Sequence, residues 1–207
     1  MFYVTTKPSW LRAFYGKCIW NIKTDQKELY LTFDDGPHPE HTPFVLEELR
    51  KHNATATFFC IGKNVTLYPG VYKMIIDSGH SIGNHTNTHL DGWRTTSKRY
   101  YTDIENAASV IDSNLFRPPY GHIKPLQASI LARKYGLKTV MWSVLTGDFD
   151  TKTSPEKCYS NVMDNIKPGQ IIVFHDNDIA AHNLRLVLPK ILENLSAQGY
   201  SFKRIEE

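Results

Sequence analysis

Two adjacent aspartates carry the clearest chemical potential in this 207-residue sequence. Asp34 and Asp35 end an apolar run and precede Gly36 and Pro37. Neighbouring side chains of an extended segment point apart, so one carboxylate could bind a metal while the other accepts a proton. A solvated Asp-Asp-Gly-Pro turn is the plainer interpretation of the same residues. The segment alone leaves both interpretations open.

A pair of histidines forms the second pattern. His85 and His89 are separated by three residues, and such a pair shares one face if the segment is helical. Both imidazole rings could then reach one ion, and neutral imidazole binds zinc, copper, nickel or iron. Nine histidines in one chain also produce this spacing by chance. Taken alone, the pair therefore favours a surface or capping role.

The two patterns together are more specific than either one. Two histidines and one carboxylate make a three-ligand site with an open position, as catalytic zinc requires. Cobalt, nickel and iron also suit this set of ligands. The second aspartate would act as a base, and His175, which follows the apolar residues Val173 and Phe174, is placed to act as an acid. The sequence thus predicts a catalytic metal centre.

These polar residues all lie where predicted strands end. Strands are expected at Leu29–Asp34, Ala56–Ile61, His80–Asn84, Lys138–Trp142, Gln170–Phe174 and near Tyr200–Lys203. Helices are expected at Pro43–His52, Val71–Ser78, Lys98–Ser113, Pro125–Tyr135, Pro155–Ile166 and Asn183–Ala197. Strands followed by helices predict a parallel sheet with helices outside it. An open doubly wound sheet and a barrel both remain possible, and both place active residues at the carboxyl ends of strands.

Four segments resemble the motifs of the polysaccharide deacetylases, the fourth carbohydrate-esterase family, and in particular a chitooligosaccharide deacetylase-like domain. Thr32 to Pro37 resembles the first motif, and His85 to His89 resembles the second, H-[ST]-x-x-H. Arg117 to Gly121 is similar to the third, and Val173 to His175 to the last. The matches follow the family's order. The resemblance implies an α/β fold, a distorted (β/α) barrel of about seven parallel strands with outer helices.

The resemblance also implies a role for each matching residue. The metal ligands would be Asp35, His85 and His89, with Zn²⁺ as the family's usual ion. Asp34 would be the catalytic base, and Arg117 would orient it and tune it electrostatically.

Further implied roles concern the substrate. The backbone N–H of Tyr120 would stabilise the oxyanion, Val173 would line the pocket for the acetyl methyl group, and His175 would protonate the leaving amine. Trp93, Tyr120 and Phe149 could also stack on sugar rings, because aromatic faces suit the apolar sides of sugars.

The family's fourth motif, D-x-x-D-W, is altered in this sequence. The segment reads Leu145-Thr146-Gly147-Asp148-Phe149. Asp148 occupies the position that would pair with His175 and raise its pKa. Leu145 replaces the first acid and Phe149 replaces the tryptophan that walls the groove. We therefore expect intact chemistry with an altered preference among sugars.

Composition narrows the possible partners and the location. The net charge of +3 comes from 24 basic and 21 acidic residues without a long run of one sign, which does not indicate nucleic-acid binding. No apolar segment is long enough to cross a bilayer. The first residues do not read as a signal peptide, which favours the cytoplasm, whereas a trimmed leader would fit a secreted or cell-envelope protein. Three cysteines without a C-x-x-C spacing predict reduced thiols.

The expected architecture is a catalytic domain over residues 28–207 with an N-terminal extension, residues 1–27, packed on it. The expected activity is removal of N-acetyl or O-acetyl groups from a carbohydrate such as N-acetylglucosamine oligomers or peptidoglycan. Hydrolysis of another non-peptide amide or ester is an alternative. A non-catalytic carbohydrate-binding module is a second alternative, which the presence of Asp34 and His175 disfavours. His38 and His41 favour surface or hydrogen-bonded roles, although either could edge the groove.

Overall fold

The computed structural model describes residue 15 and residues 18–206. The predicted N-terminal extension therefore falls partly outside the described residues, at positions 1–14, 16 and 17. The eight strands form one sheet in the order β5-β4-β3-β2-β1-β7-β6, with β8 beside the start of β1. Their bounds are β1 Glu28–Asp34, β2 Thr57–Cys60, β3 Ser81–Asn84, β4 Leu115–Phe116, β5 Lys138–Thr139, β6 Val144–Leu145, β7 Ile171–His175 and β8 Ser201–Phe202.

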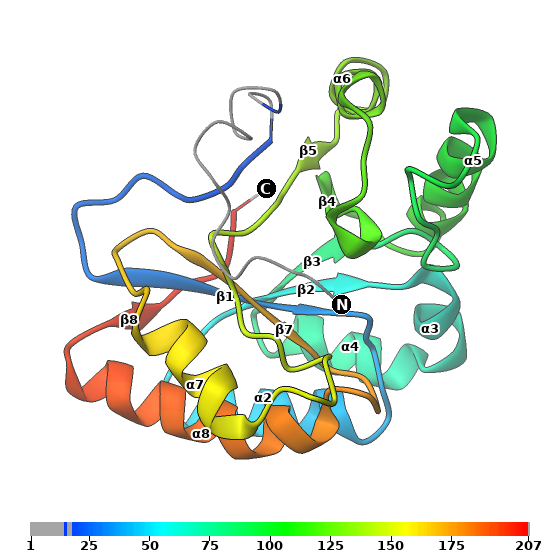
Figure 1. Cartoon of the computed structure of the whole chain (residues 1–207). Coiled ribbons are helices and arrows are strands. Elements are labelled where there is room, and N and C mark those ends of the chain that lie inside the picture. Colours follow the sequence, from blue (N-terminus) through cyan, green and yellow to red (C-terminus); the bar gives the residue numbers. More distant parts are fainter. Residues whose placement is uncertain (1–14, 16–17, 207) are drawn as a thin grey trace.

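All pairings between these eight strands are parallel in the part of the chain that the structure describes, and the sheet curls into a half-barrel (Figure 1). Among the described residues no pairing joins β5 to β6, so the circle of strands stays open there. Seven strands follow the curl, and β8 pairs outside that path. The prediction of a distorted (β/α) barrel of about seven parallel strands is confirmed.

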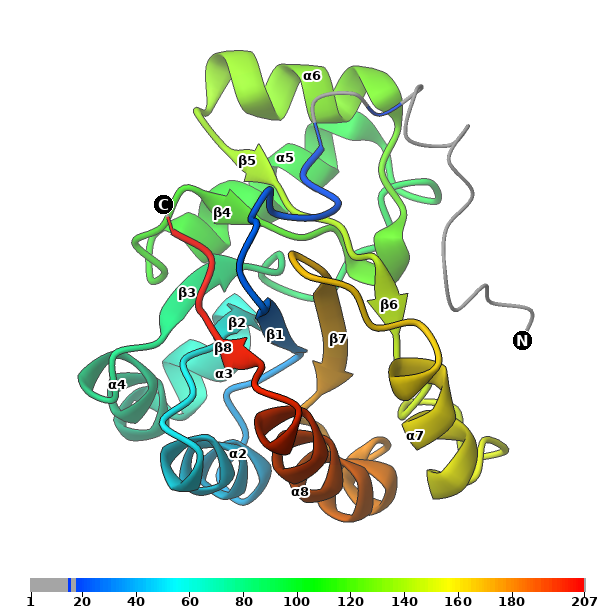
Figure 2. The ribbon, with the colours of Figure 1, turned by 90° about the vertical axis from the view of Figure 1, so that its left-hand side faces the viewer.

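The helices lie outside the sheet, as the alternation of strands and helices predicts. Figure 2 shows α4, α2, α8 and α7 side by side around one side of the strands. The bounds are α2 His41–Lys51, α3 Gly62–Leu67, α4 Pro69–Asp77, α5 Ser97–Ala108, the 3-10 helix η1 Pro119–Gly121, α6 Pro125–Lys134, α7 Pro155–Met163 and α8 Ala181–Ala197. Within the described ranges, none of these helices combines the length and the apolar character that a membrane span needs.

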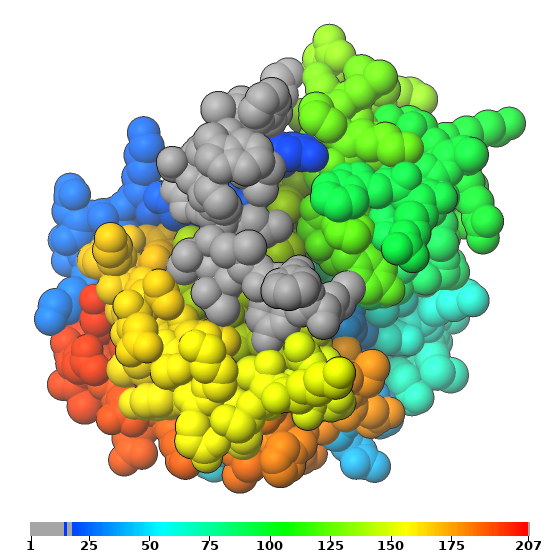
Figure 3. Space-filling view, viewed as in Figure 1, coloured from blue at the N-terminus to red at the C-terminus, as the bar shows by residue number. Residues whose placement is uncertain are grey.

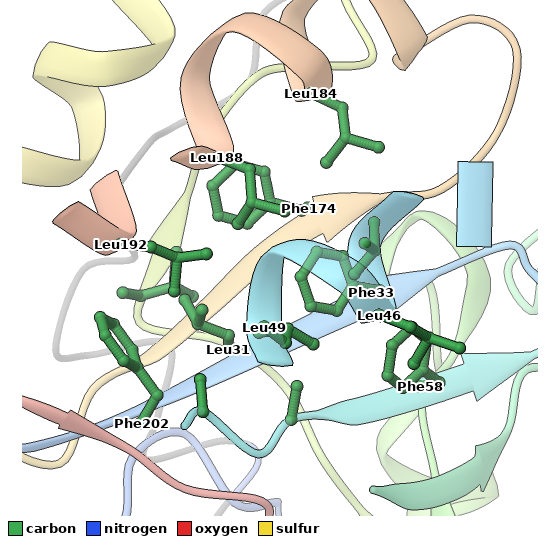
Figure 4. Packing of buried hydrophobic residues seen from close by; sticks show 14 of the residues in the cluster. Leu31, Phe33, Leu46, Leu49, Phe58, Phe174, Leu184, Leu188, Leu192 and Phe202 are labelled. Carbon is green, nitrogen blue, oxygen red and sulfur yellow. The ribbon is translucent and has the colours of Figure 1, made fainter. Parts of the chain in front are cut away.

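Strand β1 separates two buried layers because its side chains alternate between the faces of the sheet. Leu29, Leu31 and Phe33 belong to the core between the sheet and the outer helices (Figure 4). Thr32 and Asp34, on the opposite face, are buried as well. The apolar face fixes the register of the strand, and that register forces the two polar side chains into the interior of the half-barrel.

The outer core is dominated by stacked aromatic rings from three neighbouring strands. The ring centroid of Phe33 lies 5.1 Å from that of Phe58 and 5.8 Å from that of Phe174. Helix α8 covers them with its apolar face, which includes Leu184 and Leu188 (Figure 4). The three cysteines are free and buried, in agreement with the expected reduced thiols.

The described residues before β1 form two isolated bridges next to the ends of strands. Ile19 pairs with Val140 in a parallel bridge, and Asn21 pairs with Gln170 in an antiparallel one. The first bridge corrects a prediction, because the expected strand Lys138–Trp142 ends as β5 at Thr139 and continues as this isolated pairing. Strands β4 and β6 and helix α3 are not predicted by the sequence pattern, since elements this short show no periodicity.

Candidate active site

Parallel pairing brings polar residues from distant parts of the sequence to one edge of the sheet. Asp34 lies opposite His175 in the register of β1 and β7. His85 directly follows β3, and its amide donates to the Cys60 carbonyl at 2.9 Å. Arg117 follows β4, and its amide donates to the Asn84 carbonyl at 2.9 Å. The carboxyl ends of the strands therefore share one site, as the fold class requires.

The three residues expected to bind metal lie together. Oδ1 of Asp35 is 3.1 Å from Nε2 of His89 and 3.5 Å from Nε2 of His85. The three atoms lie close enough to hold one ion. Oδ1 of Asp35 is also buried and has no aligned hydrogen-bond donor. A buried carboxylate oxygen left in this way is costly unless a cation faces it, so the residues present fit a divalent metal.

Hydrogen bonds at the far side of each ring favour the same conclusion. Nδ1 of His85 lies 2.8 Å from the Arg117 carbonyl oxygen, which can only accept, so Nδ1 carries the proton. In the neutral ring, Nε2 then carries the lone pair and faces Asp35. Metal-bound histidines have the same arrangement, with one nitrogen donating to a carbonyl and the other free to bind the metal. Nδ1 of His89 lies 3.1 Å from the Tyr120 hydroxyl oxygen. Burial alone would raise the pKa of Asp35, but the nearby rings of His85 and His89 and the charge of His175 hold that pKa well below its usual range.

The histidine pair does not use a helical face. The segment from His85 to His89 contains no helix, and Thr86 and His89 have positive φ angles of 64° and 57°. Left-handed conformations of non-glycine residues cost on the order of 1–3 kcal/mol each and cluster at functional sites. Asp103 of α5 stabilises this turn, because its carboxylate accepts from the amides of Asn87 and Thr88, each at 2.9 Å. No sequence motif indicates this role of Asp103.

The expected base, Asp34, is held by a fully buried arginine. Nη1 of Arg117 donates to Oδ1 of Asp34 at 2.8 Å and to the Thr32 hydroxyl at 2.6 Å. Nη2 of Arg117 donates to the Met141 carbonyl at 2.9 Å, and its guanidinium lies 4.1 Å above the ring centroid of Phe59. Burial lowers the pKa of Arg117, whereas Asp34 raises it. The hydrogen bond from this cation fixes the orientation of the Asp34 carboxylate.

The expected acid, His175, is paired with Asp148. Its Nδ1 lies 2.9 Å from Oδ1 of Asp148, and its backbone amide donates to Oδ2 at 2.8 Å. Burial by itself lowers the pKa of His175, but the charge and hydrogen bond of Asp148 outweigh burial and raise it to about 9. The ring is therefore a cation at neutral pH, and Nε2 is the atom left to give a proton. These two residues come from distant parts of the sequence, and Figure 3 shows the yellow-green segment around residue 150 beside the orange segment around residue 180.

The residues expected to contact substrate occupy different depths. Val173 is buried at the end of β7. Phe149 places its ring centroid 5.1 Å from that of His175, and Tyr120 places its own 4.6 Å from that of His89. Trp93 does not touch these histidines but stacks on His122 with the ring centroids 3.9 Å apart. Trp93 and Tyr120 are both about half exposed.

A second group of possible ligands, His38, His41 and Asp178, has the opposite hydrogen-bond pattern. Nδ1 of His38 accepts from the amide of His41 at 3.3 Å, and Nδ1 of His41 faces an Arg185 nitrogen at 3.3 Å. Both Nε2 atoms must then carry protons, and they point at Oδ1 of Asp178 at 3.3 and 2.9 Å. This group is satisfied without a metal, so the two histidines have hydrogen-bonded roles.

Two residues after His175 belong to the site but lie outside the family motifs quoted above. Asp176 is buried and accepts from the Gly36 amide at 2.9 Å and from the Thr42 hydroxyl. Burial, together with the charge of Asp35, raises the pKa of Asp176 to about 7, although hydrogen bonds from Thr42 and Gly36 lower it. Asn177 donates to Oδ2 of Asp35 at 2.6 Å. In the sequence, the only signal for Asp176 and Asn177 is their position directly after His175.

A curled parallel sheet with a candidate cation site, a buried Asp-Arg pair and a His-Asp pair at its carboxyl edge defines a (β/α)-barrel hydrolase as the class. Residues 21–140, more than half of the chain, match the polysaccharide deacetylase family, and the protein belongs to that family.

Individual relatives agree with this assignment. A peptidoglycan-N-acetylglucosamine deacetylase of Bacillus cereus is 35% identical over 198 residues, which cover 93% of this chain and 92% of the relative. A chitooligosaccharide deacetylase of Azorhizobium caulinodans is 37% identical over 162 residues, covering 75% and 76%. The crystal structure of the Bc1960 peptidoglycan N-acetylglucosamine deacetylase superposes with a TM-score of 0.87 at 30% identity, covering 97% of this chain and 95% of that one.

Proposed function

We propose that this protein is a metal-dependent deacetylase that removes N-acetyl or O-acetyl groups from a carbohydrate. The observation that carries the proposal is the unpartnered Oδ1 of Asp35, which faces Nε2 of His85 and of His89. The curated relatives act on peptidoglycan and on chitooligosaccharides, which supports N-acetylglucosamine polymers or oligomers as the substrate.

Asp35, His85 and His89 would hold the metal, with Zn²⁺ the first candidate and Co²⁺, Ni²⁺ or Fe²⁺ compatible with the same donors. When bound, such an ion supplies Lewis-acid chemistry, which polarises an acyl carbonyl and makes water easier to deprotonate. The protein contributes fixed donors, because the hydrogen bonds of His85 to Arg117 and of His89 to Tyr120 orient both rings.

Asp34 accepts a proton from the attacking water in this proposal. Its hydrogen bond with Arg117 fixes the position of the carboxylate, and a base must be held within reach of the proton that it accepts. The water oxygen forms a bond to the acyl carbon, and the backbone N–H of Tyr120 donates to the developing oxyanion. One such donor contributes roughly 3 kcal/mol to stabilising a transition state.

His175 donates the Nε2 proton to the leaving nitrogen or oxygen. The bond between that atom and the acyl carbon breaks, and acetate and the free amine or hydroxyl leave. Asp148 keeps the ring protonated before this step, and general acid catalysis of this kind contributes typically about 10²–10⁴-fold. Val173 would line the acetyl pocket, and Phe149, Tyr120 and Trp93 would contact the sugars.

Acetate release from N-acetylglucosamine oligomers tests this proposal. We expect metal-stripped protein to be inactive, added Zn²⁺ to restore release, and Asp34→Asn to abolish it. Asp150→Asn, which removes a carboxylate from a neighbouring loop, is the matched control and should stay active. Metal binding without acetate release would contradict the proposed substrate.

One observation favours hydrolysis of another amide or ester as a second candidate. Leu145 is buried where the family motif has an acid, and Phe149 replaces the tryptophan. A different groove wall would select a different sugar conjugate. Hydrolysis of another amide or ester, without acetate release from chitin oligomers, peptidoglycan or acetylated xylan, would support this second candidate. Binding of oligomers without any hydrolysis would instead indicate a carbohydrate-binding module.

A further inference from the structure

Three consecutive residues after β7 contact the loop that carries Asp35. The amide of Asp176 donates to the Asp34 carbonyl at 3.1 Å, and its carboxylate accepts from the Gly36 amide at 2.9 Å. Asn177 reaches the side chain of Asp35 between them. Residues 176–178 therefore fix the loop after β1 by contacts between residues far apart in the sequence.

The two carboxylate oxygens of Asp35 have different environments. Oδ2 accepts from Nδ2 of Asn177 at 2.6 Å. Oδ1 has no hydrogen-bond donor and faces Nε2 of His85 and of His89. One oxygen is thus committed to the protein, and the other is left for a cation.

The orientation of the Asn177 amide is itself fixed. Its Oδ1 accepts from the backbone amide of Ala180 at 2.9 Å, at the start of α8. A backbone N–H can only donate, so the oxygen must face Ala180 and the NH₂ group must face Asp35. The helix start therefore decides which side of the amide the carboxylate meets.

We propose that Asn177 is a positioning residue for the metal, which holds Oδ2 of Asp35 so that Oδ1 alone is presented as a one-oxygen ligand. This inference rests on the proposed metal site of Asp35, His85 and His89. A neutral donor suits the position, because Asp34 precedes Asp35, Asp176 precedes Asn177, and both of these neighbouring carboxylates are buried. Hydrogen bonds to ligating carboxylates tune metal sites, and their loss typically weakens affinity by about 10–100-fold.

Two variants separate the donor from the rest of the side chain. Asn177→Ala removes both hydrogen bonds. Asn177→Asp keeps the shape and the acceptor for Ala180 but replaces the donor with a carboxylate oxygen. Asp178→Ala is the matched control, because it removes the contacts of the same segment with His38 and His41 without touching a proposed ligand.

The experiment is a calorimetric titration of the metal-free full chain with Zn²⁺, with Co²⁺ absorption as a second readout. We expect both Asn177 variants to bind roughly 10–100-fold more weakly and to show a changed Co²⁺ spectrum at saturation, with Asp178→Ala like the wild type. Urea unfolding of the metal-free variants checks that they fold.

Wild-type affinity in a folded Asn177→Asp variant would overturn this inference and leave the proposed function standing. An equal loss in Asp178→Ala would also overturn it, because the effect would then belong to the loop as a whole. If the wild-type protein itself binds no metal, both this inference and the metal-dependent function fail. The wild-type titration therefore distinguishes failure of the proposed function from failure of the Asn177 inference alone.

Discussion

Removing the carboxylate of Asp148 should change the titration of His175 more than any other single substitution. The pKa of His175 is raised from 6.5 to about 9, a difference of about 2.5 pH units. At roughly 1.36 kcal/mol per unit, the folded environment as a whole, burial included, favours the imidazolium by about 3 kcal/mol. Asp148 is the largest favourable contributor, and burial opposes it.

Asp148→Asn keeps the size of the side chain but alters both contacts. The amide oxygen can still accept from the backbone N–H of His175, which directs the NH₂ group at Nδ1. Nδ1 must then accept, so the ring becomes the neutral tautomer with its proton on Nε2. Burial is then opposed only by the smaller contributions of Asp35 and Asp34, and we expect the pKa of the ring to fall to 6.5 or below.

The assay is an NMR pH titration of the His175 ring in the metal-free protein. We expect a midpoint near 9 in the wild type, a midpoint more than two units lower in Asp148→Asn, and no change in the control Asp150→Asn. A midpoint that stays near 9 in Asp148→Asn would refute this account of the acid. Deacetylation by the variant should also be lost first at high pH, where the acid is already deprotonated.

The same shift predicts how stability depends on pH. The folded-state pKa of His175 is raised, so its contribution is fully present below pH 6.5 and is lost as pH rises through about 9. Urea unfolding of the wild type between these pH values should show a loss of up to about 3 kcal/mol from this residue. Asp148→Asn should lack that loss.

Three further substitutions test other parts of the structure. Arg117→Met should destabilise the protein by about 3–5 kcal/mol in urea unfolding, because it leaves Asp34 buried without its cation; unchanged stability would contradict the buried pair. Gly36→Ala should cost about 1–3 kcal/mol, since the added Cβ would clash with Oδ2 of Asp176, and wild-type thermal unfolding would show that the loop can yield. His41→Ala should bind one metal ion per chain in calorimetry, as the wild type should. Two ions per chain in the wild type and one in the variant would instead assign a metal to the second histidine group.

Local periodicity was enough to predict the main strands, most helices and the edge of the sheet that carries the polar residues. The alternation in Leu29 to Asp34 predicts a strand, and its end places two carboxylates at the carboxyl edge. This inference needs only neighbours in the sequence. The ordered motifs then predicted the family and which residues to compare.

Short elements and turns depended on contacts that the sequence pattern does not contain. Strands β4 and β6 have two residues each and are defined by their neighbours in the sheet. The sequence offered a helical face for His85 and His89, but the left-handed residue Thr86 and the carboxylate of Asp103 bring the two rings together instead. Such a turn persists only because residues of another element stabilise it.

The proposed roles of individual atoms are the part that only the tertiary structure could decide. Among the described residues, two histidines and one aspartate come together in two places, and residue types alone do not rank these two groups. Packing places a carbonyl beyond Nδ1 of His85 but an amide beyond Nδ1 of His38, which gives the two rings opposite proton positions. Asn177 reaches Asp35 across 142 positions of the sequence, a contact that exists only because β1 and β7 are neighbours in the sheet. The sequence determined the chemical groups, and long-range packing decided which of their atoms face one another.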